Sequence, residues 1–129
     1  MLKVLASILC YDLWFYASHI VLHKYMWDIH SVHHSTNPDT LSWSDTYVSH
    51  PVEDFFQGIG MFFPYAFLNY TVFETALILL FLNLRGMARH ESRKEYRITW
   101  QHHVLHHKYM NYNYGEYWID CACGTLLRC

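Results

Sequence analysis

Two long apolar stretches dominate the pattern of the chain, and both predict helices that enter a membrane. The first runs from Met1 to about Val21, with Lys3 and Asp12 as its only formal charges. A helix of about 20 apolar residues spans the hydrocarbon layer. A cleaved signal peptide also begins with a basic residue before an apolar run. We reject that alternative because this run continues unbroken into a histidine motif.

The second apolar stretch, Phe55 to Leu84, predicts a hairpin rather than one straight helix. A single helix of this length would measure about 45 Å, which exceeds the hydrocarbon thickness. Glycines and Pro64 interrupt the stretch, so we place the turn between Pro64 and Asn69. Glu74 lies in the returning leg and should face protein or water, because a carboxylate in lipid is costly.

Polar and charged segments connect these stretches. A polar loop is predicted from Ser35 to Asp45, because this segment contains Asn-Pro, a turn signal. His50-Pro51 followed by two acids is typical of a helix start. The segment from Arg85 to Arg97 carries more bases than acids, whereas the hairpin tip carries no Lys or Arg. By the positive-inside rule, we expect the end of the protein that carries the histidines to face the cytosol. The basic segment itself is expected to form a solvent-exposed face.

Composition limits the classes of protein that the chain can represent. It has 129 residues, 53% of them hydrophobic, and a formal net charge of −2. We therefore predict one all-α domain, residues 1–129, folded as a membrane helical bundle, and no nucleic-acid partner. The four cysteines form no disulfide framework, which favours reduced thiols. The aromatic segment after the last histidine motif suits a membrane interface; it contains Tyr109, Tyr112, Tyr114, Tyr117 and Trp118.

Histidine spacing is the chemical signal of the chain. Eleven histidines occur, and eight of them form three motifs: His19 and His23; His30, His33 and His34; His103, His106 and His107. Asp12, Tyr16, His19 and His23 share one helical face, and we expect His30 to continue it. Neighbouring residues on a helix diverge by about 100°, so His33 and His34 should serve different ions. Eight imidazoles exceed what one ion can bind, and a dinuclear metal centre is the simplest interpretation.

The residues alone leave the metal open. Imidazole suits zinc, copper, iron and nickel. No HExxH motif is present, so a zinc protease would lack its general base, and Cys121-Ala-Cys123 is too tightly spaced for a zinc ribbon. Further candidates are His90, His50, His102 and Asp12. Asp12 either orients a ligand imidazole or lies as a charge at the membrane interface.

These motifs resemble the fatty acid hydroxylase/sterol desaturase superfamily of membrane di-iron oxygenases. The likeness begins with HxxxH at His19 and HxxHH at His30. It then includes HPxED, which spans His50 to Asp54. It continues with a single histidine, His90, and a final HxxHH with NYG and GT, ending at Thr125. The HPxED and HHxxHH elements look most like the sterol C-4 methyl oxidase branch. The family usually has further transmembrane helices before the first motif, so the chain is either a compact member or a truncated copy.

The resemblance implies a hydroxylase or desaturase of a fatty acyl chain or sterol in lipid biosynthesis. It implies two iron ions, which zinc can replace in recombinant protein, and O2 as co-substrate. It also implies a cytochrome b5 or ferredoxin electron donor and, in a eukaryote, the endoplasmic reticulum. By position the expected ligands are His19, His23, His30, His33, His34, His90, His103, His106 and His107. A non-catalytic membrane metal-binding relative and a zinc-dependent membrane hydrolase are the alternatives.

Overall fold

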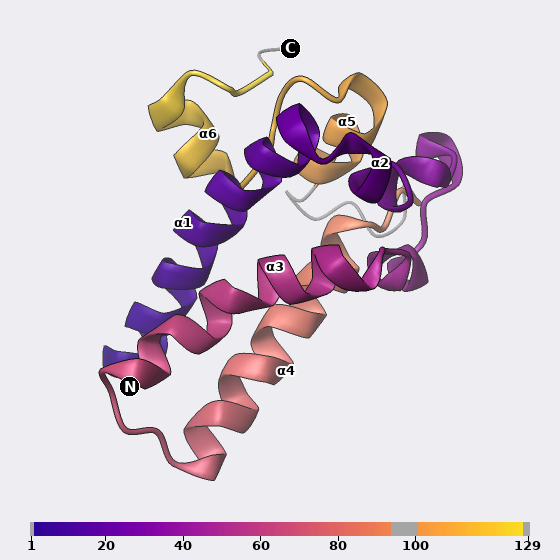
Figure 1. Ribbon diagram of the computed structural model, residues 1–129. Coiled ribbons are helices and arrows are strands. Elements are labelled where there is room, and N and C mark those ends of the chain that lie inside the picture. The colour runs from indigo at the N-terminus through magenta and orange to yellow at the C-terminus, as the bar shows by residue number, and fades with distance from the viewer. Residues whose placement is uncertain (1, 94–100, 128–129) are drawn as a thin grey trace.

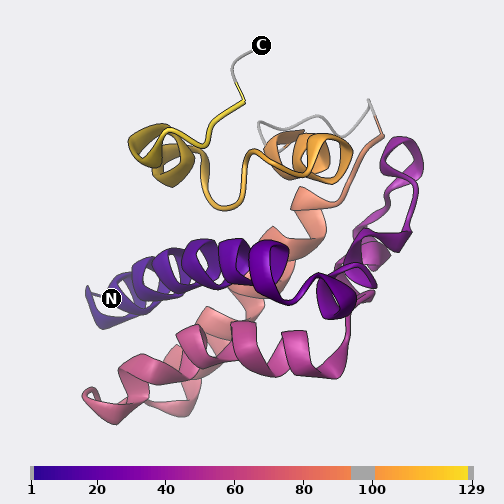
Figure 2. The same ribbon diagram turned by 45° about the horizontal axis from the view of Figure 1, so that its top comes forward.

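A computed structural model describes residues 2–93 and 101–127. Throughout these residues the regular structure is helical and no strand occurs, which confirms the predicted all-α class. Three long helices, α1, α3 and α4, converge at one end of the molecule on the short helices α2 and α5 (Figure 1). Figure 2 shows α3 on one side of α1 and the C-terminal segment α5–α6 on the other.

The first apolar stretch forms α1, Leu2–Tyr25. It is long and apolar enough to cross a membrane, and among the described helices it alone meets both criteria. It presents Leu2, Leu5, Leu9 and Leu13 to the surroundings. Such a row of exposed leucines suits contact with lipid.

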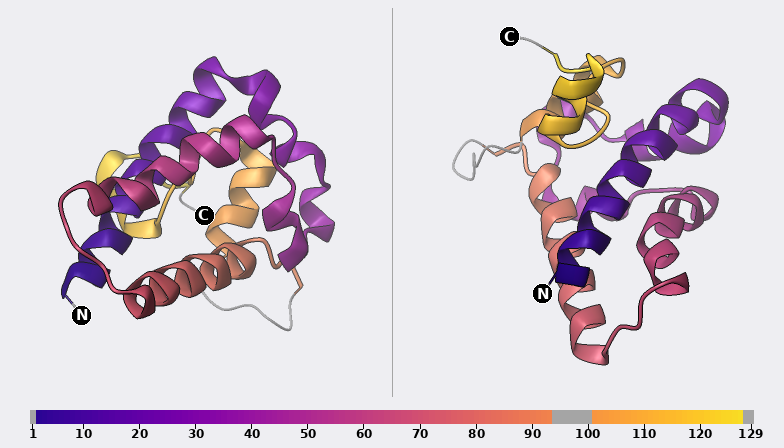
Figure 3. Two further views of the ribbon diagram at one scale, coloured as in Figure 1. Left: turned by 60° about the horizontal axis from the view of Figure 1, so that its bottom comes forward. Right: turned by 90° about the vertical axis from the view of Figure 1, so that its left-hand side faces the viewer.

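The second stretch forms the predicted hairpin. It consists of α3, Pro51–Phe62, a 3-10 turn at Phe63–Ala66, and α4, Val72–Arg89. His50 caps α3, because its Nδ1 accepts a hydrogen bond from the Val52 N–H at 3.2 Å. The turn of the hairpin lies beside the N-terminal end of α1 (Figure 3). There Lys3 pairs with Glu74 at 2.8 Å, so Glu74 faces protein, as expected.

A glycine sets the close approach of α1 and α3. A Cβ built on Gly60 would lie 2.6 Å from the Cβ of Trp14, and the Trp14 indole donates to the Phe56 carbonyl at 2.8 Å. Both contacts require the two helices to touch at this point. The spacing between α1 and α3 therefore depends on the absence of a side chain at Gly60.

We expect Gly60→Ala to destabilise the fold by about 1–3 kcal/mol, the usual range for overpacking. Gly58→Ala is the matched control, since a Cβ there meets nothing within 4 Å, and it should be neutral or stabilising. Thermal unfolding in detergent micelles measures both. Equal melting temperatures for the two variants would contradict this packing.

Buried ion pairs tie α1, α4 and the C-terminal segment together, and they correct two expectations. Arg85 of α4 binds both carboxylate oxygens of Asp12, and Arg85 and Arg89 both pair with Glu116. Asp12 therefore neutralises an arginine instead of orienting an imidazole, and its place at the membrane interface stays a prediction. Arg85 and Arg89 are buried and are not part of a solvated face. Lys94 and Arg97 fall outside the described residues.

Candidate metal centre

The fold gathers the nine expected ligands at the end of the bundle where α1, α2, α4 and α5 meet. They form two groups, and in each the ligand nitrogens all lie within 4.8 Å of one another. The first group contains His19, His23, His30, His34 and His106. The second group contains His33, His90, His103 and His107. Each group could hold one metal ion.

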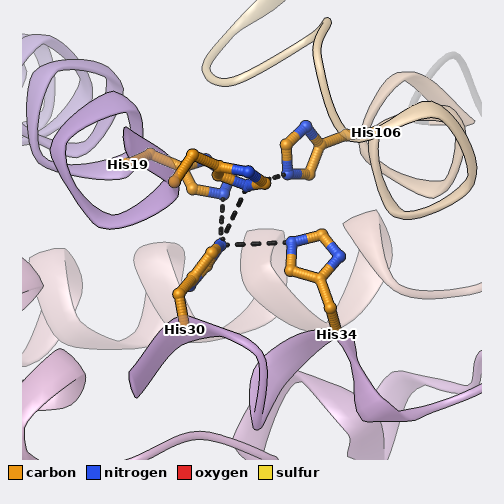
Figure 4. Close-up of side chains that lie close together, drawn as sticks. His19, His30, His34 and His106 are labelled. Carbon is orange, nitrogen blue, oxygen red and sulfur yellow. Dashed lines mark hydrogen bonds between the residues drawn. The ribbon is translucent and has the colours of Figure 1, made fainter. Parts of the chain in front are cut away.

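The first group is centred on His30. Its Nε2 lies 3.0 Å from Nε2 of His19 and 3.1 Å from those of His23 and His34. Nε2 of His23 lies 2.9 Å from that of His106. Figure 4 shows the rings of His19, His30, His34 and His106 turned toward one another.

The second group is as compact as the first. Nε2 of His90 lies 3.2 Å from Nε2 of His33, and the same distance separates His107 from His103. His90 ends α4, and His103 and His107 stand one turn apart on α5, Gln101–Tyr109. All four side chains are buried.

Several rings of both groups donate a hydrogen bond from Nδ1 to a backbone carbonyl. Nδ1 of His33 donates to the Val48 carbonyl at 2.8 Å, and Nδ1 of His90 donates to the Gly86 carbonyl at 2.9 Å. A neutral imidazole that donates through Nδ1 keeps a lone pair on Nε2. Nε2 of His33 and Nε2 of His90 therefore face each other as two acceptors. A metal ion bound between them would accept both lone pairs.

The same logic applies to the first group. His19 and His106 donate through Nδ1 to the carbonyls of Tyr114 at 2.5 Å and Tyr112 at 2.6 Å. His30 Nδ1 lies 2.9 Å from the Glu53 carboxyl. One proton on His30 could not bridge the three ring nitrogens around it. Two nitrogens that bind one ion at about 2.0–2.1 Å lie no more than about 4.2 Å apart, and the Nε2 spacings of 2.9–3.1 Å fall within that limit.

Burial also keeps these rings neutral, as metal ligands must be. It lowers the pKa of His30 to about 4 and the pKa of His90 to about 3. The pKa values of His34, His106 and His107 are lowered by burial as well, and neighbouring imidazoles add to the effect. Burial raises the pKa of the Glu53 carboxyl to about 7. The nine side chains thus fit the pair of ions that the motifs predict.

The division between the two groups follows the helical argument. His33 and His34 fall into different groups, as predicted for neighbouring residues, and so do His106 and His107. The predicted continuous stripe through His30 is wrong, however. α1 ends at Tyr25, and His30 belongs to a separate short helix, α2, Trp27–His30, followed by a 3-10 turn at His33–Ser35.

The three additional candidates lie outside both groups. His50 caps α3, and Asp12 binds Arg85. His102 bonds to Asp120 at 2.8 Å, so it is not simply polar surface. Tyr16 bonds to Thr125 at 3.1 Å, in keeping with a packing role.

Asp120 is a supporting residue that sequence reasoning did not identify. It is fully buried on α6, Tyr117–Cys123. Its carboxylate accepts the backbone N–H groups of Tyr114 and Gly115, each at 2.9 Å, and the Thr125 hydroxyl at 2.6 Å. These bonds fix the loop whose carbonyls hold His19 and His106. The available signal was the pair of acids, Glu116 and Asp120, between the NYG and GT elements. Tyr114 itself is buried, which corrects its expected interface position.

We expect Asp120→Asn to weaken metal binding about 10- to 100-fold, the usual effect of losing a group that orients ligands. The amide accepts at one atom only, so the loop loses part of its support. Asp39→Asn is the control, because Asp39 is exposed and, among the described residues, its ion pair is with surface Lys108. Chelator competition on both purified proteins gives the affinities, and equal values would refute the role of Asp120.

A cavity of about 240 Å³ adjoins the second group. His33, His90 and His103 of the second group and His19 of the first line it, together with other residues of α1, α3 and α4. Its apolar lining includes Phe15, Met61, Leu79 and Leu82, and its polar lining includes Thr46, Ser49, Gln57 and Asn83. The cavity is also lined by four charged residues, Glu53, Asp54, Arg85 and Arg89. An apolar chain with a polar end could lie in this space beside the histidines.

Comparison with known proteins agrees with this geometry. A family model described as fatty acid hydroxylase matches residues 4–125. No curated protein and no solved structure matches the chain. The family model does not single out the sterol C-4 methyl oxidase branch, so that part of the sequence interpretation stays a prediction. The match covers nearly the whole chain and every histidine of both groups, and the protein therefore belongs to the fatty acid hydroxylase family.

Proposed function

We propose that the protein is a membrane-bound, iron-dependent oxidoreductase that uses O2 to hydroxylate or desaturate a lipid. Membership of the fatty acid hydroxylase family supports a membrane oxygenase acting on lipids. The observation that carries the finer proposal is the pair of all-histidine groups with a cavity of mixed apolar and polar lining beside them. Two Fe ions, one in each group, are the proposed cofactors.

The residues of the chain would bind the two iron ions and hold the lipid in a fixed orientation beside them. The first group and the second group each supply neutral nitrogens, and backbone carbonyls fix the direction of the rings. When bound, iron would supply the oxygen activation that side-chain acid–base chemistry cannot provide. The cavity would hold the lipid with one C–H bond near His33, His90 and His103, and its apolar side chains would contact the lipid chain.

Orientation relative to the membrane is part of the proposal. The N-terminal end of α1 and the hairpin tip lie at the opposite end of the molecule from α2 and α5, which carry histidines of both groups (Figure 1), so the metal centre would lie just outside the lipid. The basic residues near it favour the cytosolic face, with the endoplasmic reticulum as the compartment in a eukaryote. A fatty acyl chain or a sterol would reach the cavity from the bilayer.

Reconstitution tests the function. The purified chain in lipid nanodiscs is loaded with Fe²⁺, supplied with a reduced donor and O2, and assayed for lipid-dependent oxygen uptake with mass spectrometry of the lipids. We expect uptake together with a hydroxylated or desaturated product. Bound metal without turnover would instead indicate a non-catalytic relative, and turnover with zinc in the absence of O2 would indicate a hydrolase.

A further inference from the structure

The cavity beside the histidines changes from polar to apolar along its length. α1, α3 and α4 all extend from the histidine end of the molecule toward the hairpin tip (Figure 1), so position along each helix gives the level of a lining residue. At the histidine end the lining includes Thr46, Ser49, Glu53, Asp54 and Arg89. Toward the hairpin tip it includes Tyr11, Met61, Leu79 and Leu82. At 1.5 Å of rise per residue, Tyr11 lies about 12 Å along α1 from His19, and Leu79 lies about 16 Å along α4 from His90.

A second cavity, of about 380 Å³, extends the apolar end. It shares Asp54 and Gly58 with the first cavity and is otherwise lined by Phe55, Ile59, Phe62 and Phe63. These four side chains follow α3 away from the histidines, and the three phenylalanines are exposed. At Gly58, which lines both cavities, a Cβ would meet nothing within 4 Å. The apolar space therefore passes over a glycine to the open face of α3, a path that a flexible hydrocarbon chain can follow and a rigid ring system cannot.

The histidine end offers both hydrogen-bond donors and hydrogen-bond acceptors to an occupant. Arg89 is buried against the Phe15 ring, and among the described residues its carboxylate partner is Glu116. A guanidinium carries five N–H donors, so some of them are left for another acceptor. Glu53 is also buried, and its Oε2 has no hydrogen-bond partner among the described residues. A head group that both accepts and donates, such as a hydroxyl, complements this end.

We propose that the substrate is a lipid with a hydroxyl-bearing head and a flexible hydrocarbon chain, and that it binds with the head at the histidine end and the chain directed toward the hairpin tip. The reverse orientation would bury the hydroxyl against Met61 and Leu79 without a partner, which is costly. The inference rests on the proposed function and specifies its substrate. The C–H bond beside the histidines is then fixed by its distance from the head. O2, two protons and two electrons from an external donor convert that bond to C–OH and release one water.

Photo-crosslinking tests the orientation without requiring turnover. The full chain in phosphatidylcholine nanodiscs is irradiated with hexadecan-1-ol probes that carry a diazirine either near the hydroxyl or near the methyl end, and the labelled residues are mapped by mass spectrometry. We expect the first probe to label Thr46 or Ser49 and the second to label Met61, Phe62 or Phe63. Excess hexadecan-1-ol should suppress both. Hexadecane should be at least about tenfold less effective, because it leaves the polar groups unpaired. A reversed pattern, or labelling that hexadecan-1-ol does not suppress, would overturn the inference.

Met61→Trp tests the chain end of the site. The larger ring fills the apolar end of the cavity, so we expect hexadecan-1-ol to bind at least about tenfold more weakly and decan-1-ol to bind within about twofold of the wild type. Phe67→Trp is the matched control, because Phe67 is exposed near the hairpin tip and lines neither cavity. If Met61→Trp lacks a melting transition, Leu79→Trp on the facing helix replaces it. An equal loss of affinity for the two alcohols would place the head at Met61 and overturn the inference.

Turnover with iron separates this inference from the proposed function. With alcohols of different chain length, we expect the new hydroxyl group or double bond at a constant number of carbons from the head. A constant number of carbons from the methyl end would overturn the orientation while supporting an oxygenase. Labelling and competition as expected, with no oxidised product, would support the orientation and reject the proposed function.

Discussion

His106→Ala and His33→Ala are each expected to lose one of two bound ions. His106 belongs to the first group and His33 to the second, and both are buried with their Nε2 atoms directed at other ring nitrogens. Removing one nitrogen leaves neighbouring lone pairs facing each other without a full coordination sphere. We expect a loss of affinity above about 100-fold at the altered group, beyond the effect of losing an orienting partner. Metal analysis after gel filtration measures it.

The chain supplies a matched control for these variants. His50→Ala removes a histidine that lies outside both groups, and this protein should retain the wild-type metal content. Each ligand variant should also keep the ion of the other group, at least in part, because the groups use different residues. If His106→Ala and His33→Ala kept both ions, the assignment of the two groups would be wrong.

Gly58→Leu is expected to abolish turnover while leaving the metal centre intact. Gly58 lines the cavity beside the second group, and a Cβ there meets nothing within 4 Å. A leucine can therefore enter the space of about 240 Å³ without disturbing the helices. A displaced substrate no longer aligns its C–H bond, and such misplacement costs about 100-fold or more in rate.

Two measurements distinguish a blocked cavity from a damaged protein. Metal content and melting temperature of Gly58→Leu should equal those of the wild type, whereas lipid-dependent oxygen uptake should disappear. Gly58→Ala fills less of the cavity and should retain most of the activity, with a preference for shorter or thinner substrates. Wild-type turnover in Gly58→Leu would show that the lipid binds elsewhere.

Much of this architecture follows from the sequence because the signals are periodic. The length of the apolar runs predicted α1 and the hairpin. The angle between neighbouring helical residues predicted that His33 and His34 bind different ions, and they belong to different groups. The family was identified from ordered histidine motifs, and the match over residues 4–125 confirms it. The position of Glu74 was foreseen because an unpaired carboxylate does not persist in lipid.

The errors arose where local pattern does not determine tertiary contact. The break after Tyr25 leaves no strong mark in the sequence, so His30 was assigned to the same helix as His19. Arg85 and Arg89 counted as surface charge, because a sequence does not show that Asp12 and Glu116 will neutralise them inside the fold. Asp120 was overlooked for a similar reason: its role depends on backbone N–H groups rather than on other motif residues.

The metal content of the purified wild-type chain tests the central claim most directly. After loading with Fe²⁺ under anaerobic conditions and removal of free metal, elemental analysis against quantitative amino-acid analysis gives ions per chain. The two groups predict two iron ions per chain. A protein that is folded, by the criterion of its melting transition, yet retains no ion would contradict the account.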